Sequence, residues 1–285
     1  MNFFQKTVAR WLEPTAEAVV QSIHIQSIAL GRIVRVDVYL PAGYESDARK
    51  KYPLLLCNDG QDLPRMGFAE TLEKQIGTKQ IQPLIAVGIY CSERRMREYG
   101  TALQPDYKGR GDLAAQHSKF VLEELLPHLR SQYAGSHQAE ETAFVGFSLG
   151  GLSAFDIAWA HPAVFGLAGV FSGALWWRSH EAIPQDPDAD RIMHGIVEKS
   201  PLLDPEQRFW FQCGALDETA DRNYNGVIDA IDDTLDLIGL LRQKGVSEQH
   251  IRYLEMPEGQ HNPQTWGVAM PDFLAWGFGG RQIAN

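Results

Sequence analysis

Cysteine is scarce in this chain of 285 residues, which contains only Cys57, Cys91 and Cys213. The number is odd and the three positions are widely spaced, so a disulfide framework is disfavoured as the organising principle of the fold. None of the three has a second Cys or a His at the short spacing that structural zinc sites use. We expect three free thiols, buried in apolar segments, in a protein of a reducing compartment.

Basic residues and long apolar runs are also scarce. Lys and Arg total 26 against 36 Asp and Glu, a formal net charge of −10, so no basic surface is expected to meet the phosphates of a nucleic acid or an anionic membrane. No window approaches the roughly 18 uninterrupted apolar residues of a membrane-spanning helix, and residues 1–12 lack the apolar core of a secretory signal. We therefore expect a cytoplasmic protein without nucleic-acid or membrane partners, in which residues 1–18 form an amphipathic helical extension.

What the chain does contain is a globular composition, 44% hydrophobic, and a regular order of elements. Apolar residues alternate over residues 19–30 and 32–40, the pattern of an antiparallel hairpin. Beyond the hairpin, short apolar runs typical of strands buried on both faces alternate with helical segments. This order predicts an α/β fold with a mostly parallel central sheet, a leading antiparallel hairpin and helices on both faces. We expect one domain over residues 19–285, with an insertion at 174–205 over the candidate site described next.

Gly-Phe-Ser-Leu-Gly at residues 146–150 matches the pattern Gly-x-Ser-x-Gly. In this motif a serine occupies a strained turn between a strand and a helix, and the glycines let strand and helix approach closely. The helix start supplies free N–H groups where negative charge develops on a substrate oxygen. An apolar strand is predicted to end at Phe147 and a helix of small residues follows at once, so Ser148 is the candidate nucleophile. Ser153 and Ser172 lie on no comparable turn.

A serine nucleophile needs a general base and an acidic residue that orients the base. After a Gly-x-Ser-x-Gly turn, the acid and then the histidine follow in the chain, each at the end of a strand. His261 follows a predicted strand at residues 251–256, and the other histidines lie at less suitable positions. Asp217 and Glu218 both follow a predicted strand at residues 208–213. We favour Asp217, since only one of two neighbouring carboxylates points back at the imidazole, and Glu218 stays the alternative.

Four short segments, taken together and in order, resemble one family. They are Asp-Gly-Gln at 59–61, Gly-Phe-Ser-Leu-Gly-Gly at 146–151, Gly-Ala-Leu-Asp at 214–217 and Gly-Gln-His at 259–261. The same segments are found in the family named Putative esterase, which includes esterase D (S-formylglutathione hydrolase), enterochelin esterases, feruloyl esterase domains and mycolyltransferases. The resemblance extends over residues 22–277.

The resemblance implies an α/β-hydrolase fold and a catalytic triad of Ser148, Asp217 and His261. It also implies an oxyanion hole made by the backbone N–H groups of Leu149 and Gln61. The N–H group of Leu149 is required by the geometry of the turn as well, whereas Gln61 rests on the resemblance alone.

Three side chains are expected at the border of the substrate pocket, again from the resemblance: Arg95, Tyr99 and Trp177. A purely structural role is the alternative for each of them. Arg95 would then pair with Glu98 one helical turn further on, and the two aromatic rings would pack in the interior.

Residues 221–232 are similar to a calcium-binding loop of the EF-hand type. Oxygen ligands fall at loop positions 1, 3, 5, 7, 9 and 12, with glycine at position 6. The ligand positions are Asp221, Asn223, Asn225, Val227 (through its carbonyl oxygen), Asp229 and Asp232. The last of these replaces the usual bidentate Glu, and no full helix enters the loop, so an Asn/Gly turn before an acidic helix N-terminus is the alternative. A structural Ca²⁺ would brace the segment that carries Asp217, and the chemistry itself needs no cofactor.

These residues predict a serine esterase that hydrolyses a carboxylic ester of a small molecule through an acyl-enzyme. Two other functions stay open. One is acyl transfer to a sugar or alcohol acceptor by the same fold. The other is a calcium-braced binding protein in which the triad is vestigial.

Overall fold

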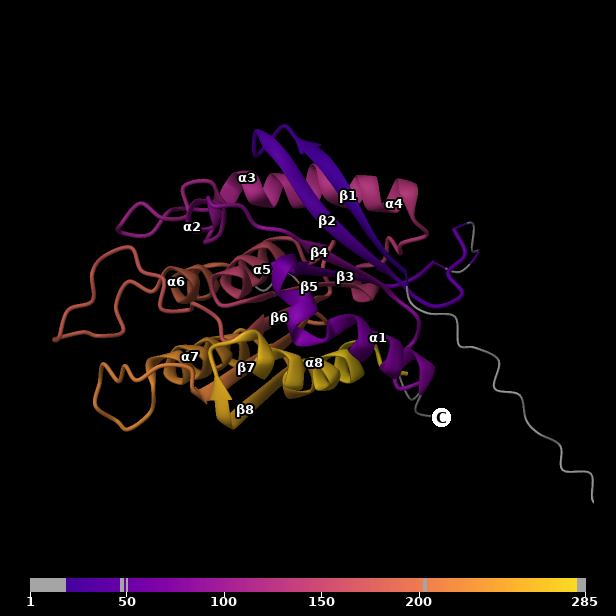
Figure 1. Cartoon of the computed structure of the whole chain (residues 1–285). Coiled ribbons are helices and arrows are strands. Elements are labelled where there is room, and N and C mark those ends of the chain that lie inside the picture. Colours follow the sequence, from indigo (N-terminus) through magenta and orange to yellow (C-terminus); the bar gives the residue numbers. More distant parts are fainter. Residues whose placement is uncertain (1–18, 47–48, 50, 202–203, 281–285) are drawn as a thin grey trace, which may run out of the picture.

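The computed structural model describes residues 19–280 apart from 47–48, 50 and 202–203, so the helical extension predicted for residues 1–18 lies outside the described residues. The strands are β1 (Val19–Ser27), β2 (Arg32–Leu40), β3 (Leu54–Asn58), β4 (Ile85–Ile89), β5 (Thr142–Phe147), β6 (Leu167–Phe171), β7 (Arg208–Leu216) and β8 (Ile251–Gln260). They form one eight-stranded sheet in the order β1-β2-β4-β3-β5-β6-β7-β8 (Figure 1). β2 is antiparallel to both β1 and β4, and all other neighbours are parallel. The predicted α/β fold with its leading hairpin is confirmed.

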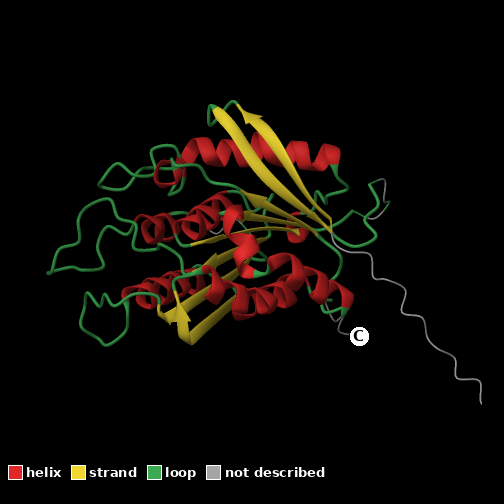
Figure 2. Cartoon of the chain, viewed as in Figure 1, coloured by secondary structure: helices red, strands yellow, loops and turns green. Residues whose placement is uncertain are grey.

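Helices cover both faces of the sheet (Figure 2). The α-helices are α1 (Phe68–Gly77), α2 (Arg95–Glu98), α3 (Ala114–Lys119), α4 (Leu126–Gln132), α5 (Leu149–Ala160), α6 (Ile192–Lys199), α7 (Asp229–Gln243) and α8 (Pro263–Phe278). A π-helical segment, η2 (Phe120–Leu125), joins α3 to α4. Three 3₁₀ helices complete the set: η1 (Gly60–Met66), η3 (Ala139–Glu141) and η4 (Glu248–His250).

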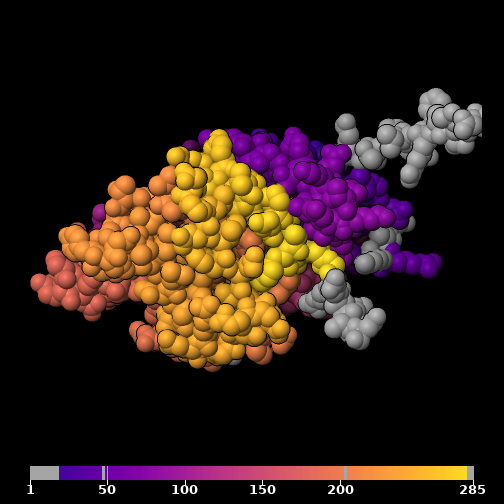
Figure 3. Space-filling model, turned by 90° about the horizontal axis from the view of Figure 1, so that it is seen from below, coloured from indigo at the N-terminus to yellow at the C-terminus, as the bar shows by residue number. Residues whose placement is uncertain are grey.

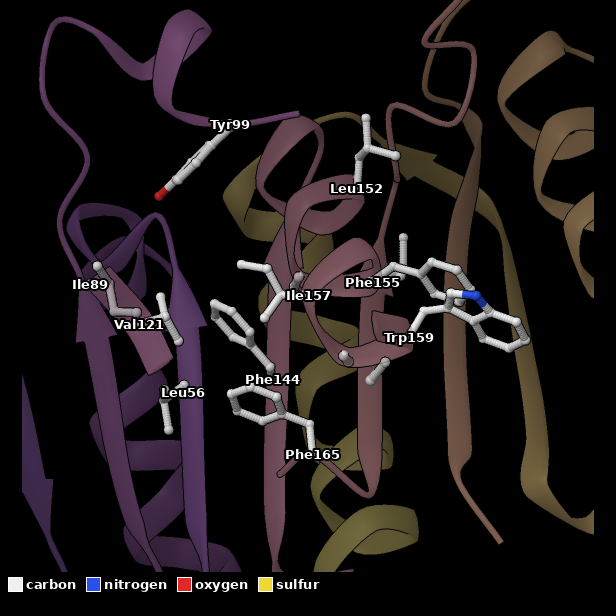
Figure 4. Close-up of a cluster of buried hydrophobic side chains, with 14 of the residues drawn as sticks. Leu56, Ile89, Tyr99, Val121, Phe144, Leu152, Phe155, Ile157, Trp159 and Phe165 are labelled. Carbon is white, nitrogen blue, oxygen red and sulfur yellow. The ribbon is translucent and has the colours of Figure 1, made fainter. Parts of the chain in front are cut away.

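A hydrophobic core lies on each face of the sheet. Phe144 of β5 belongs to the cluster on the face covered by α3–α4 and α5, where its ring stacks on that of Phe165 with centroids 5.3 Å apart (Figure 4). Phe147 of β5 packs with Trp266 in the second core, under α1 and α8. Figure 3 shows the yellow region of α8 between the violet and the orange parts of the chain. Successive side chains of a strand point to opposite faces, so a strand between two cores is apolar throughout, which is why β5 appears in the sequence as an uninterrupted apolar run.

The strand predicted to end at Phe147 and the helix predicted to follow it coincide with β5 and α5. The amphipathic pattern of residues 111–133 predicts one long helix, but the π-helical turn of η2 interrupts it. Pro127, at the start of α4, has no N–H to donate to the carbonyl four residues before it, and the chain widens into a π turn just ahead of the proline.

The loops after the parallel strands gather at one end of the sheet. Figure 1 shows α2, the segment before α6 and the segment before α7 at this end. Residues 174–205 connect β6 to β7 and contain α6; their role as an insertion over the active site stays a prediction. All three cysteines are free. Of the helices in the described part of the chain, none has both the length and the apolar character needed to cross a membrane.

Candidate active site

Ser148 directly follows β5 and precedes the first residue of α5. Its backbone has φ 56° and ψ −123°, a region that costs a residue other than glycine about 1–3 kcal/mol. A Cβ at Gly146 would lie 2.1 Å from the carbonyl oxygen of Gly150, so this turn accepts only glycine at that position. The N–H of Ser148 donates to the carbonyl of Phe171 at the end of β6 (2.9 Å). The turn therefore holds a half-exposed serine at the carboxyl end of the parallel strands.

Asp217 and His261 directly follow the neighbouring strands β7 and β8, at the same end of the sheet. The residues immediately before them, at the ends of β7 and β8, are partners in the register of the two strands. A Cβ at Gly214 would lie 2.4 Å from the carbonyl oxygen of Gly259, so glycine at 214 permits the two strand ends to approach closely. Because β5, β6, β7 and β8 are consecutive in the sheet, the loops of Asp217 and His261 begin at the same edge as Ser148.

The two neighbouring carboxylates of this loop have different partners. Oδ2 of Asp217 accepts the N–H of Gly214 (3.0 Å), whereas Oδ1 is buried and has no hydrogen-bond partner among the described residues. Glu218 instead accepts the N–H of Ala230 in the first turn of α7 (2.7 Å). This arrangement leaves a carboxylate oxygen of Asp217 available for His261 and favours Asp217 over Glu218.

Trp266, near the start of α8, connects the loop of His261 to β5, the strand that precedes Ser148. Its ring stacks on Phe147 with centroids 5.1 Å apart, and it meets the edge of the His261 ring at 5.5 Å. Its indole N–H donates to the hydroxyl of Ser172 (2.9 Å). Sequence reasoning missed this residue, because a tryptophan in an apolar helix looks the same whether it packs in the core or supports a catalytic ring.

Within the described residues, the imidazole of His261 makes no hydrogen bond to Ser148 or to Asp217. Hydrogen bonds between catalytic groups are often long or poorly aligned in an enzyme without substrate. In the part of the chain that the structure describes, no competing hydrogen bond occupies the imidazole of His261 or Oδ1 of Asp217.

The two N–H groups expected to form an oxyanion hole lie at the starts of helices. Leu149 is the first residue of α5 and Gln61 the second residue of η1, and N–H groups in a first turn have no partner within their own helix. The side chain of Gln61 is held in place: its Nε2 donates to Asp59 (3.0 Å) and its Oε1 accepts the N–H of Cys91 (3.3 Å).

The three residues expected at the substrate pocket take different places. Arg95 makes a bidentate ion pair with Asp59, and the side chain of Arg95 is 28% exposed. The alternative pairing of Arg95 with Glu98 is wrong, since Arg32 and Arg94 occupy that carboxylate.

Tyr99 and Trp177 are 1% and 0% exposed, so in this conformation both rings pack in the interior. The hydroxyl of Tyr99 accepts the N–H of Asp59 (3.1 Å), and burial raises the pKa of this phenol far above its ordinary value. Contact of either ring with a substrate stays a prediction.

The side chains of the calcium-like loop, residues 221–232, form hydrogen bonds to other groups of the same loop. The carboxylate of Asp221 accepts the N–H groups of Asn225 and Gly226 (3.1 and 2.9 Å). The side-chain amides of Asn223 and Asn225 donate to Oδ2 of Asp232 (3.0 and 2.8 Å). Loop positions 1, 3, 5 and 12 thus converge, with Gly226 at φ 86° in the sharp turn, but the amides of Asn223 and Asn225 turn their nitrogen atoms toward Asp232 and would have to rotate to offer oxygen ligands to a cation.

Position 9 of the same loop fits a cation less well. Asp229 accepts the N–H of Arg222 (2.8 Å) and contacts its guanidinium (3.1 Å). Val227 donates its N–H to Asn225 (2.7 Å). Across the described ranges of the chain, no group of three or more His, Cys, Asp or Glu side chains is arranged to hold a metal, so the three carboxylates of the predicted ligand set, Asp221, Asp229 and Asp232, do not gather around one point in this structure.

Residues 27–276 match the family described as Putative esterase. The chain belongs to this family. The four segments that suggested this esterase family are also the ones that the fold brings to the carboxyl edge of the sheet, after β3, β5, β7 and along the end of β8.

Two curated relatives match part of this chain. One is described as the uncharacterized protein YbbA of Bacillus subtilis, 24% identical over 149 residues, which are 51% of this chain and 58% of that protein. The other is an endo-1,4-beta-xylanase/feruloyl esterase of Xylanibacter ruminicola, 26% identical over 169 residues, which are 55% of this chain and 22% of that protein. The matches therefore span less than two thirds of either relative.

Among solved structures, the chain is similar to the enterobactin esterase of Shigella flexneri, with a TM-score of 0.70 and 20% identity, covering 90% of this chain and 58% of that one. It is also similar to a ferulic acid esterase, with a TM-score of 0.70 and 17% identity, covering 92% and 98% of the two chains. At these identities the similarity establishes an α/β-hydrolase-like fold.

Proposed function

We propose that this protein is a serine esterase that hydrolyses a carboxylic ester of a small molecule. The observation that carries the proposal is the strained backbone of Ser148 at the end of β5, with the loops of Asp217 and His261 starting side by side at the same edge of the sheet. Membership of the esterase family supports the same reaction.

In the proposed reaction the Ser148 hydroxyl attacks the ester carbonyl carbon while His261 takes its proton. The resulting oxyanion accepts hydrogen bonds from the N–H groups of Leu149 and Gln61. When the C–O bond of the ester breaks, His261 returns the proton to the departing alcohol and an acyl-Ser148 remains. Water then attacks this acyl group, again with His261 as base, and releases the acid. Asp217 holds the imidazole in the required tautomer throughout.

The test is release of the alcohol from a set of short activated acyl esters. We expect steady turnover preceded by a burst of about one alcohol per chain, the kinetic sign of an acyl-enzyme. Faster product formation when a sugar or simple alcohol is added, with a new ester as product, would identify an acyltransferase instead. Absence of both turnover and labelling by a fluorophosphonate would favour a binding protein with a vestigial triad.

The pH dependence follows from the surroundings of His261. Desolvation by its neighbours, which include Trp266, lowers the pKa of His261 from its ordinary 6.5; the carboxylate of Asp217 opposes this shift and the guanidinium of Arg95 adds to it. The base must be neutral, so kcat/KM should rise with pH, with a midpoint below 6.5, and level off near neutrality. A pH–rate profile of a non-ionisable ester measures the midpoint. A value above 7 would contradict a desolvated His261 as the base.

Calcium binding by residues 221–232 is a separate part of the proposal. We expect titration calorimetry to detect Ca²⁺ with a Kd on the order of 10⁻⁵–10⁻³ M and the Tm to rise by a few degrees, about 2–4 °C, in excess Ca²⁺. Asp221→Ala should abolish both effects, whereas Asp272→Ala, an exposed carboxylate on α8, should leave them unchanged. No heat of binding by the wild-type protein at millimolar Ca²⁺ would remove the ion from the proposal.

A further inference from the structure

The two halves of the proposed oxyanion hole come from segments far apart in the sequence, and the structure joins them at the end of β3. Asn58 donates from its side-chain amide to the carbonyl of Gly150 in α5 (2.9 Å). Asp59 directly follows Asn58, and a Cβ at Gly150 would lie 2.5 Å from Oδ2 of Asp59. The carboxylate of Asp59 therefore lies against the start of α5, between the segment of Gln61 and that of Leu149.

A carboxylate in this place is chemically unfavourable for ester hydrolysis. Asp59 is 1% exposed in its side chain, so water does little to screen its charge. In the proposed reaction a second negative charge develops on the substrate oxygen that the N–H of Gln61 holds, two residues along the chain from Asp59, and like charges repel strongly in a site of low dielectric. The protein has to neutralise Asp59 for the oxyanion hole to work.

Arg95 both neutralises Asp59 and connects the segment of Asp59 to the end of β5. Its Nε and Nη2 donate to the two oxygens of Asp59 (2.7 and 2.6 Å), and Nη2 also donates to the carbonyl of Phe147, immediately before Ser148 (3.3 Å). Burial alone would lower the pKa of the guanidinium, but the hydrogen bonds and charge of Asp59 outweigh it and raise that pKa, so Arg95 stays charged. Its planar fork thus connects the Gln61 segment to the strand that carries the nucleophile.

We propose that Arg95 is a positioning residue of the reaction, which fixes the Gln61 N–H relative to Ser148 through Asp59 and Phe147 and neutralises the carboxylate beside the oxyanion. This inference rests on the proposed esterase function. The positioning role differs from direct binding of the substrate by Arg95. In the positioning role, the guanidinium stabilises the transition state of the reaction and leaves the affinity for the substrate almost unchanged.

The test compares Arg95→Gln, Asp59→Asn and the double variant on one activated ester. It also measures their affinity for an alkylboronic acid, which adds to the serine hydroxyl and mimics the tetrahedral oxyanion. We expect Arg95→Gln to lower kcat about 100-fold with KM changed less than about threefold, and to weaken boronate binding by a similar factor. The double variant removes both buried charges and keeps amide groups that hydrogen-bond, so its kcat should return to within about tenfold of wild type.

Arg97→Gln is the matched control, since Arg97 lies on the same helix α2 and its ion pair with Asp112 is exposed (53% and 39%). Its kcat and KM should equal those of the wild type. Arg95→Lys retains the charge without the fork and replaces Arg95→Gln if that variant does not fold; we expect its kcat to fall about tenfold at constant KM.

Several results would overturn the positioning role. An increase in KM at constant kcat in Arg95→Gln would make Arg95 a substrate-binding residue. A double variant no faster than Arg95→Gln, wild-type kcat in Arg95→Lys, or an equal loss in Arg97→Gln would each exclude the mechanism described. Absence of esterase activity in the wild-type protein would overturn the proposed function itself, whereas the kinetic outcomes of the variants overturn only the role of Arg95.

Discussion

Replacing Ser148 by alanine is expected to lower kcat/KM for ester hydrolysis by about 10⁴-fold or more. The change removes the atom that forms the acyl-enzyme, so only the weak catalysis of binding and the oxyanion hole remains. The fold should persist, because the bonds that hold the turn are made by the backbone of residue 148 with Phe171 and Ala174, and these survive the substitution. Initial rates on an activated acyl ester, together with circular dichroism, measure both effects.

Ser153→Ala is the matched control for this variant. Ser153 lies on α5, in the same small-residue helix, and is 1% exposed. Its hydroxyl has no place in the proposed reaction, so activity should stay within about twofold of wild type. Full activity in Ser148→Ala, or loss of activity in Ser153→Ala with the fold intact, would show that the nucleophile has been assigned to the wrong residue.

The second large effect is expected at the acid. Asp217→Asn should lower kcat about 10³–10⁴-fold, because an amide can stabilise the wrong tautomer of His261 and cannot balance the imidazolium charge. Glu218→Gln keeps an oxygen that accepts the N–H of Ala230. It should therefore retain at least about a tenth of the activity and lose about 1 kcal/mol of stability or less.

Steady-state kinetics and urea unfolding on this pair of variants decide between two carboxylates that are adjacent in the chain. The reverse pattern, an inactive Glu218→Gln beside an active Asp217→Asn, would give the role of the acid to Glu218. Wild-type activity in both variants would mean that neither carboxylate orients the base.

The alternation of apolar runs and helical segments was sufficient to predict the sheet, because strands between two cores must be apolar on both faces. The Gly-x-Ser-x-Gly pattern was similarly sufficient to predict the turn at Ser148, since its glycines are required by contacts within a few residues, such as that of Gly146 with Gly150. In both cases the physical cause is local in the chain or repeats with a regular period, and single-sequence reasoning can detect it.

The contacts that support the candidate site could not be predicted in this way. Asp59 and Arg95 are 36 residues apart and Trp266 and Ser172 are 94 residues apart. Each pair meets only because the order of strands in the sheet brings separate loops to one edge. Arg95 is also three residues before Glu98, a spacing typical of a helical ion pair, so the local pattern offered as an alternative a pairing that the fold does not make.

The choice between Asp217 and Glu218 likewise depended on three-dimensional contacts. Both residues follow the same strand, and nothing in their order separates an acid that orients a histidine from one that caps a helix. The hydrogen bond of Glu218 to the start of α7 and the partnerless oxygen of Asp217 support the predicted choice of Asp217.

Mass spectrometry of the protein, quenched within the burst phase of an activated ester, tests the assigned nucleophile most directly. We expect the acyl group on the peptide that contains Ser148, at about one per chain, and its disappearance in Ser148→Ala. An acyl group found on another residue, or turnover without any acylated peptide, would contradict catalysis by this serine.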